Sequence, residues 1–321
     1  MPKPLIYHLR GAIRSVTEPV AVIDCGSNST RLLVDDGAGV ALARDMRITR
    51  LSAGVDASRR LSLDAIERTM RVLDEYRVTA NHLGARRGVV VATSAVRDAT
   101  NRDEFTERAR RHTGFDVRVL DGDEEAALSY DGATADLADD ERPTVIVDVG
   151  GGSTELAARL AGVLHAASMQ LGCVRVSERA LGTGVVGVAE RNAAQAMIDL
   201  ALDEVVARDP VWSTLTGRVR LIGLAGTVAT LVQLDVGLAA YDRSVVHHHR
   251  VTRTAVQTWR DRLARETPDQ RLAHPGMVVG REDVLVGGLM ILDAVMGRLG
   301  AVDLLSSESD ILDGVAASFR R

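Results

Sequence analysis

Short runs of β-branched and aliphatic residues alternate with longer amphipathic segments along this chain of 321 residues. Short apolar runs bounded by Gly, Asn or Asp are typical of strands, whereas a 3.6-residue apolar repeat is typical of helices. Ser62, which precedes Leu63 and Asp64, has the sequence context of a helix N-cap. In the first half of the chain, the pattern predicts strands at 20–24, 30–34, 40–44, 88–93 and 116–120 and helices at 62–82, 101–113 and 123–137.

The same order of elements restarts after Pro143. Each half begins with a three-stranded antiparallel meander and continues as alternating helix and strand, which predicts an α/β fold built twice. The expected domains are 1–138 and 139–321, and the final helix, at about 310–321, could pack back on the first domain. The second half predicts strands at 144–149, 154–159, 163–168 and 218–224 and helices at 174–181, 189–208, 252–266, 281–299 and 310–319, with another helix starting at 227.

One segment with a glycine turn occurs in both halves, at 22–32 and at 146–156. Both copies are strands that end in Asp, followed by a turn of Gly, Ser or Asn and a second strand. Such turns direct backbone N–H groups into one concavity that binds anions, and glycine would supply the positive φ that this geometry needs. The predicted phosphate-binding residues are Gly26, Ser27, Asn28, Ser29, Gly150, Gly151, Gly152, Ser153 and Thr154.

Asp24 and Asp148 end the two buried strands. A buried carboxylate needs a partner, and Mg²⁺ is a natural one beside a phosphate site. Either aspartate could instead cap a neighbouring turn. Ligands of α/β sheets bind at the carboxyl ends of strands, so the cleft between the two halves is the expected site.

Composition excludes several classes of protein. The net charge of −5 argues against a general nucleic-acid binder, and no apolar run approaches the length of a membrane span. Cys25 and Cys173 are too few for a disulfide framework. Lys3, the only lysine, is not in a P-loop or protein-kinase context. The first eighteen residues are interpreted as an extension or short amphipathic helix rather than a signal peptide, so a cytoplasmic location is expected.

Seven segments carry a resemblance to a known family, at 24–32, 92–101, 121–126, 148–156, 171–175, 224–227 and 307–314. Together they resemble the exopolyphosphatase / guanosine pentaphosphate phosphohydrolase family, in a short form without the C-terminal histidine-aspartate domain. The resemblance implies two ribonuclease-H-like domains of the actin, sugar-kinase and heat-shock ATPase superfamily, with a central cleft between the domains.

The resemblance also implies roles for particular residues. Glu125 matches the catalytic glutamate that orients and partly deprotonates the attacking water, and Glu124 remains the alternative. Arg97 would stabilise charge on the transferring phosphoryl group. Gly226 and Thr227 could contact distal phosphates or a guanosine, although a plain helix N-cap fits them equally. The implied cofactor is Mg²⁺ or Mn²⁺.

Ion pairing or substrate contact is also expected of three further arginines, on weaker grounds. Arg31 is expected to pair with Asp148 or Glu155 across the cleft. Besides Arg97, Arg175 and Arg250 are the arginines considered able to contact a polyphosphate chain. The run 247–249 consists of three histidines, and because adjacent side chains cannot all face one ion, it is interpreted as a solvated loop rather than a metal site.

The leading hypothesis is an exopolyphosphatase that acts on inorganic polyphosphate. Hydrolysis of pppGpp to ppGpp is a close alternative, because both substrates end in a phosphoanhydride. A non-catalytic sensor of polyphosphate or alarmone and a small-molecule kinase are the alternatives from other classes. No nucleic-acid or membrane partner is expected, and a homodimer is left open. With an acidic net charge, the protein is expected to handle short polyphosphates at least as well as long ones and to release the chain between cuts.

Overall fold

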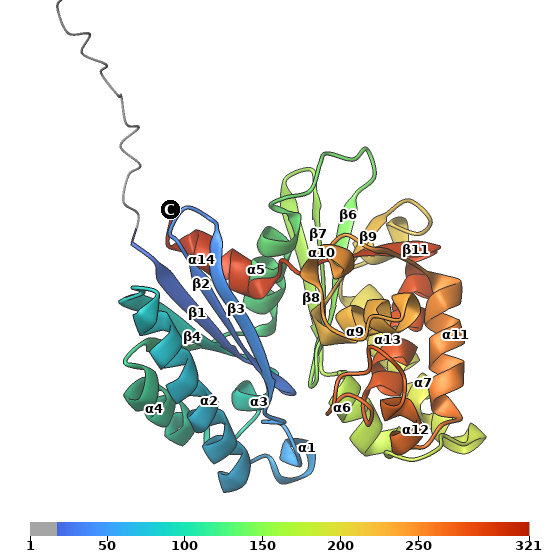
Figure 1. Ribbon diagram of the computed structural model, residues 1–321. Coiled ribbons are helices and arrows are strands. Elements are labelled where there is room, and N and C mark those ends of the chain that lie inside the picture. The colour runs from blue at the N-terminus through green and yellow to red at the C-terminus, as the bar shows by residue number, and fades with distance from the viewer. Residues whose placement is uncertain (1–17, 321) are drawn as a thin grey trace, which may run out of the picture.

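The computed structural model describes residues 18–320. The predicted extension or amphipathic helix at the start of the chain, and Lys3, therefore lie outside the described residues. The described chain forms two α/β domains that stand side by side, each built on a mixed sheet (Figure 1).

The two sheets repeat one arrangement of strands. The first has the order β3-β2-β1-β4-β5 and the second β10-β11-β9-β6-β7-β8. β1 pairs antiparallel with β2 and parallel with β4, and β6 pairs antiparallel with β7 and parallel with β9. The predicted fold class, two ribonuclease-H-like α/β domains with a cleft between them, is confirmed. The strands are β1 (Val20–Cys25), β2 (Ser29–Asp35), β3 (Ala41–Ile48), β4 (Arg87–Ala92), β5 (Asp116–Val119), β6 (Thr144–Val149), β7 (Thr154–Leu160), β8 (Val163–Met169), β9 (Arg220–Leu224), β10 (Arg250–Thr252) and β11 (Asp303–Ser306).

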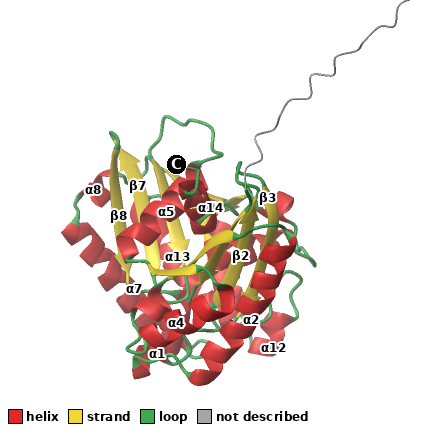
Figure 2. Cartoon of the chain, turned by 90° about the vertical axis from the view of Figure 1, so that its left-hand side faces the viewer, coloured by secondary structure: helices red, strands yellow, loops and turns green. Residues whose placement is uncertain are grey.

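Helices cover the faces of both sheets, as the view in Figure 2 also shows. In the first domain, the helix predicted from Ser62 begins as expected, because the Ser62 hydroxyl accepts a hydrogen bond from the N–H of Ala65. The helix predicted at 174–181 is divided into a short α-helix and a π-helical turn. The helices are α1 (Val55–Ser58), α2 (Leu63–His82), α3 (Ser94–Arg97), α4 (Arg102–Thr113), α5 (Gly122–Thr134), α6 (Cys173–Val176), the π-helix η1 (Ser177–Leu181), α7 (Val188–Arg208), α8 (Val211–Thr214), α9 (Ala225–Val236), α10 (Arg243–Val246), α11 (Arg253–Ala264), α12 (Pro268–Leu272), α13 (Leu285–Leu299) and α14 (Ile311–Ser318).

Two helices link the domains. α5 comes before the second sheet in the sequence, yet its residues Ala126, Tyr130 and Ala133 pack against β6, β7 and β9. α14 follows the second sheet, yet it packs on the first, where Ile311 and Val315 join a cluster with residues of β1, β2 and β4. The two helices also pack against each other between the sheets (Figure 1).

The α5–α14 contact depends on two glycines. A Cβ on Gly132 would lie 2.8 Å from the carbonyl carbon of Asp310, and one on Gly314 would lie 2.8 Å from that of Leu128. Neither distance is compatible with a side chain, so glycine is required for the close approach of the helices. Within residues 18–320, no helix is both long enough and apolar enough to cross a membrane.

Candidate active site

A cavity of about 450 Å³ lies between the two domains. Its walls come from both glycine turns, from the carboxyl ends of β1 and β6, and from the first turns of α5 and α9. The segment 307–312, which returns the chain to the first domain, closes one side. The cleft predicted from the strand ends is therefore a real cavity in this structure.

The two glycine turns face each other at close range. A Cβ on Gly151 would lie 2.8 Å from the Cβ of Ser27 and 3.2 Å from the backbone nitrogen of Asn28. None of Gly26, Gly150, Gly151 and Gly152 has a positive φ. The prediction that these glycines supply left-handed backbone was therefore wrong. Glycine is needed at Gly151 because the backbones of the two domains approach too closely for a side chain.

Most of the predicted phosphate-binding residues line the cavity, but three do not. The hydroxyl of Thr154 donates to the carbonyl of Leu171 at 2.5 Å, and that of Thr227 donates to the carbonyl of Val149 at 3.1 Å. Gly152 lies behind the turn, against the side chains of Ser94 and Ser27. These three positions support the turns from behind. The residues that line the cavity are Gly26, Ser27, Asn28, Ser29, Gly150, Gly151, Ser153 and Gly226.

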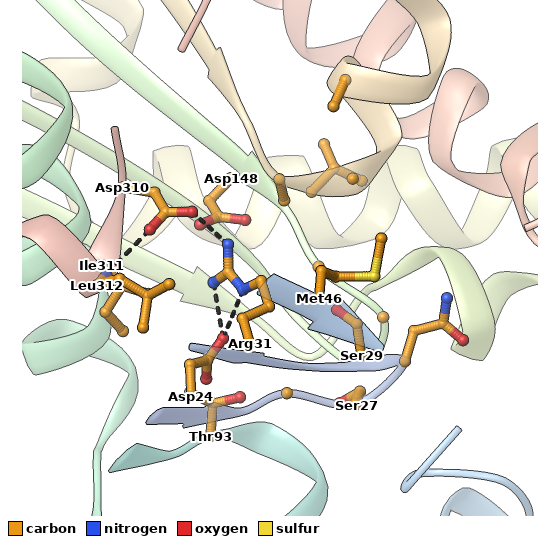
Figure 3. A pocket seen from close by; sticks show the side chains of 18 of the residues that line it. Asp24, Ser27, Ser29, Arg31, Met46, Thr93, Asp148, Asp310, Ile311 and Leu312 are labelled. Atoms are coloured by element: carbon orange, nitrogen blue, oxygen red, sulfur yellow. Dashed lines mark hydrogen bonds and ion pairs between the residues drawn. The ribbon is translucent and has the colours of Figure 1, made fainter. Parts of the chain in front are cut away.

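Three aspartates gather at the floor of the cavity (Figure 3). Asp24 and Asp148 are the next-to-last residues of β1 and β6, and Asp310 caps α14. Burial raises the pKa of Asp24, and it raises that of Asp148 to about 7, where Asp310 and Asp24 add to the effect. Among the described residues, Oδ1 of Asp24 is buried and has no hydrogen-bond partner. Clustered carboxylates with an unpartnered oxygen fit a hard divalent cation such as Mg²⁺ or Mn²⁺.

Arg31 does not pair as predicted. Its Nε and one terminal nitrogen donate to Oδ2 of Asp24, at 2.9 and 2.7 Å, and its other terminal nitrogen contacts Asp310. No salt bridge forms with Asp148 or Glu155 in the described chain. The expectation failed because Asp310 is 279 residues away in the sequence and is brought to the site only by α14.

Glu125 is the buried carboxylate of the first turn of α5. The side chain of Asp121 caps this helix by accepting the N–H of Glu124, which fixes the orientation of the turn. Glu125 lines the cavity and is 9% exposed, whereas Glu124 lies outside the cavity lining, is half-buried and pairs with Arg118. Burial raises the pKa of Glu125 to about 8, although Arg97 opposes the shift. Of the two glutamates, only Glu125 is placed to act in the cavity.

Comparisons of the sequence and of the fold with known proteins identify relatives of this chain. The model of the Ppx/GppA phosphatase family matches residues 32–318. Exopolyphosphatase 2 of Mycobacterium tuberculosis is 38% identical over 315 residues, which cover 93% of this chain and 98% of that protein. The chain belongs to the Ppx/GppA phosphatase family. The crystal structure of an exopolyphosphatase-like protein has a TM-score of 0.87 at 33% identity, covering 94% of this chain and 99% of its own. The Aquifex aeolicus PPX-GPPA enzyme has a TM-score of 0.76 at 27% identity, covering 94% of this chain and 99% of its own.

In this Ppx/GppA family member, Arg97 lies behind Glu125. One terminal nitrogen of Arg97 donates to Oε2 of Glu125 at 3.0 Å and to the carbonyl of Leu120 at 2.9 Å. Arg97 is not among the residues that line the cavity. These contacts indicate that Arg97 holds the Glu125 carboxylate in place. A direct contact between Arg97 and a phosphoryl group stays a prediction.

No sequence motif predicted a role for Arg281, and Glu155 was expected only as a possible partner of Arg31. Arg281 is 7% exposed, lines the cavity and packs over Gly226 so closely that a Cβ there would collide with the guanidinium. No carboxylate of residues 18–320 lies within 4.0 Å of Arg281, and burial lowers its pKa. Glu155 is buried beside the cavity, and its Oε1 accepts from the Ser168 hydroxyl at 2.8 Å. Burial, Glu125 and Asp148 raise the pKa of Glu155 well above its ordinary value.

The histidine run is not the solvated loop that was predicted. The side chain of His247 is 14% exposed and its Nε2 lies 2.9 Å from a carboxylate oxygen of Asp136. Its Nδ1 accepts the backbone N–H of Glu308 at 3.0 Å, so in the neutral ring Nε2 carries the hydrogen and donates to Asp136. His247 thereby joins the two segments that connect the domains. With His248 and Asp136 it also forms a group whose ligand atoms all lie within 4.8 Å of one another, which is close enough to hold a metal ion.

The other two arginines considered for the polymer path are engaged elsewhere. Arg175 is buried and forms ion pairs with Asp56 at 3.1 Å and Asp98 at 2.8 Å, which tie α6 to the first domain. Arg250 pairs with Asp303 on the neighbouring strand. Neither lines the cavity. A contact of either arginine with a polyphosphate chain outside the cavity stays a prediction.

Proposed function

We propose that this protein is an exopolyphosphatase, which hydrolyses the terminal phosphate of inorganic polyphosphate with the help of Mg²⁺ or Mn²⁺. The observation that carries the proposal is the position of Glu125, a buried carboxylate on the wall of a cavity that is also lined by two glycine turns. The name of the relative from Mycobacterium tuberculosis, exopolyphosphatase 2, supports the choice of substrate.

In this proposal, Glu125 orients a water molecule and accepts one of its protons. The water oxygen bonds to the terminal phosphorus while the phosphoanhydride P–O bond breaks, and the shortened polyphosphate leaves. Arg97 holds the Glu125 carboxylate through the 3.0 Å contact. Backbone N–H groups of the two turns and the guanidinium of Arg281 bind phosphate oxygens.

Asp24 and Asp148, with Asp310 beside them, would hold the divalent cation. The cation would neutralise charge on the phosphates when bound. It also accounts for the carboxylates themselves, because three aspartates on the wall of the same cavity would otherwise repel a polyanion.

One observation favours pppGpp as a second candidate substrate. Besides its polar groups, the cavity is lined by less polar residues, among them Met46, Ala229, Val278 and Tyr241. Apolar side chains in the same cavity as a phosphate site have the chemistry to contact a nucleoside, and polyphosphate has no group for them. The cytoplasmic location and a homodimer stay predictions.

Phosphate release tests the proposal. Long polyphosphate, short polyphosphate and pppGpp are incubated in parallel with Mg²⁺, with Mn²⁺ and with EDTA. Glu125→Gln should lower the rate by about 10²–10⁴-fold, because a general base is lost, and should leave substrate affinity within a few-fold. The matched control is Glu124→Gln, which changes the adjacent glutamate outside the cavity lining and should keep normal turnover.

The same experiment separates the alternatives. A sensor would bind these compounds and release no phosphate from any of them. In a further incubation with ATP and a phosphoryl acceptor, a kinase would form ADP without releasing free phosphate. Near-normal turnover by Glu125→Gln would remove Glu125 from the mechanism, even if the protein hydrolyses polyphosphate.

A further inference from the structure

Arg31 is held by two carboxylates that come from opposite ends of the chain. Three donor atoms of its guanidinium are engaged, two with Asp24 on β1 and one with Asp310 at the start of α14. Figure 3 shows the guanidinium between these two aspartates, with Asp148 beside it. Asp24 and Asp310 lower the net cost of burying this arginine and raise its pKa above the ordinary value, although burial opposes that shift.

Negative charge exceeds positive charge in the cluster formed by Arg31 and the three aspartates. Three aspartates contribute three negative charges when ionised, and Arg31 supplies one positive charge. The Asp24 side chain is 5% exposed and that of Asp310 is 9% exposed, so water screens the excess poorly. Arg31 lowers the pKa of Asp148 through its charge, but Asp148 receives only a 3.5 Å contact from the Ser129 hydroxyl.

Arg31 and a divalent cation would need the same oxygens. Oδ2 of Asp24 accepts two hydrogen bonds from Arg31, which leaves only the unpartnered Oδ1 and the oxygens of Asp148 readily available. A second positive centre beside the guanidinium is also repelled by it. With its present contacts, the aspartate cluster therefore cannot supply enough oxygen ligands to a divalent metal ion and also keep all its hydrogen bonds to the Arg31 guanidinium.

We propose that Arg31 is a resident counter-cation that weakens the binding of divalent metal until a phosphate chain enters the cavity. The chain supplies new acceptors for the guanidinium, which releases lone pairs of Asp24 and Asp310 to the metal. Metal and phosphate then bind cooperatively, and each alone binds weakly. This inference rests on the proposed function, because it assumes that the cavity takes a phosphate chain and a divalent cation.

The position of Arg31 supports this exchange. It lies on β2, immediately after the first glycine turn, and it lines the same cavity as Ser27 and Ser29. A guanidinium binds phosphate oxygens with the same bidentate geometry as it binds carboxylates. Arg31 can thus exchange one kind of acceptor for the other without leaving the cavity.

The test is metal binding without turnover. Binding of Mn²⁺ is measured by the electron paramagnetic resonance signal of the free ion, with Mn²⁺ alone and with methylenediphosphonate, whose P–C–P link cannot be hydrolysed. For the wild-type protein, we expect the phosphonate to tighten Mn²⁺ binding at least about tenfold. For Arg31→Met, Mn²⁺ alone should already bind at least about tenfold more tightly than to the wild type, since a nearby positive charge is gone.

Arg44→Met is the matched control. Arg44 lines the same cavity and is similarly buried, but it pairs with Asp313 rather than with the aspartates of the cluster. Its removal takes away the same charge and should change Mn²⁺ affinity much less than Arg31→Met does. An equal gain in both variants would show a general effect of cavity charge and would overturn the specific role of Arg31.

Equal or weaker binding of Mn²⁺ to Arg31→Met would also overturn the inference. If Arg31→Met does not fold without metal, Mn²⁺ should restore its folding. The inference would also be overturned if Mn²⁺ failed to restore folding of this variant and methylenediphosphonate had no effect on Mn²⁺ binding by the wild type. Because no phosphate is released in this measurement, its result is separate from the question of whether the protein hydrolyses polyphosphate.

Discussion

Replacing Gly314 with alanine should test the contact on which the active site depends. Gly314 lies inside α14, and its added Cβ would be 2.8 Å from the carbonyl carbon of Leu128 and 3.2 Å from its Cα on α5. These neighbours are backbone atoms, so no side chain can rotate away. The two helices must separate by several tenths of an ångström or more, and α14 carries Asp310 at its N-terminus.

The size of the effect follows from two opposing contributions. Overpacking at a tight contact costs about 1–3 kcal/mol, and we expect the upper end of this range because the clash is with backbone. Alanine is favoured over glycine inside a helix by about 1 kcal/mol. The free energy of unfolding should therefore fall by about 2 kcal/mol, which corresponds to a decrease of about 3 °C in the thermal midpoint for a chain of 321 residues.

Thermal and denaturant unfolding measure this change. Gly184→Ala is the control, because no atom lies within 4 Å of its added Cβ and its φ is not positive; it should stay within about 0.5 kcal/mol of the wild type. A Gly314→Ala midpoint equal to or above that of the wild type would refute the reasoning. It would mean that α5 and α14 can move apart at no cost.

Three further predictions concern activity. Arg97→Lys should lower turnover more than substrate affinity, because lysine cannot reproduce the two contacts that Arg97 makes with Glu125 and Leu120; complete rescue in steady-state kinetics would show that only charge matters. The pKa of Glu125 is raised to about 8, and a base must be deprotonated, so kcat/KM should rise with pH up to about 8; a profile that falls over this range would contradict the assignment. On a gel time course, long polyphosphate should shorten through intermediates of all lengths, whereas its direct conversion to phosphate would show that the chain is not released between cuts.

The repeated glycine turns made the fold and the outline of the site predictable. β6 begins and ends at the predicted residues, Thr144 and Val149, because a buried β-branched run bounded by proline and glycine has few other interpretations. The short strands β10 and β11 were missed. Each is only three or four residues long, so neither shows a full alternation.

The partners of charged side chains were much less predictable. Asp310 reaches Arg31 across 279 positions, and Asp136 reaches His247 across 111. Such pairs depend on the crossing of α5 and α14, which no local pattern encodes. Arg281 was missed for a similar reason, since what marks it is a lack of carboxylate partners among residues 18–320 of the folded chain, and no sequence motif reports that.

The role of Glu125 at the centre of the proposed reaction is tested most directly by phosphate release from polyphosphate by Glu125→Gln and Glu124→Gln, measured side by side with Mg²⁺ at saturating substrate. We predict that Glu124→Gln keeps the wild-type rate and that Glu125→Gln loses about 10²–10⁴-fold while still binding the substrate. Equal rates for the two variants, or no Mg²⁺-dependent phosphate release by the wild-type protein, would contradict it.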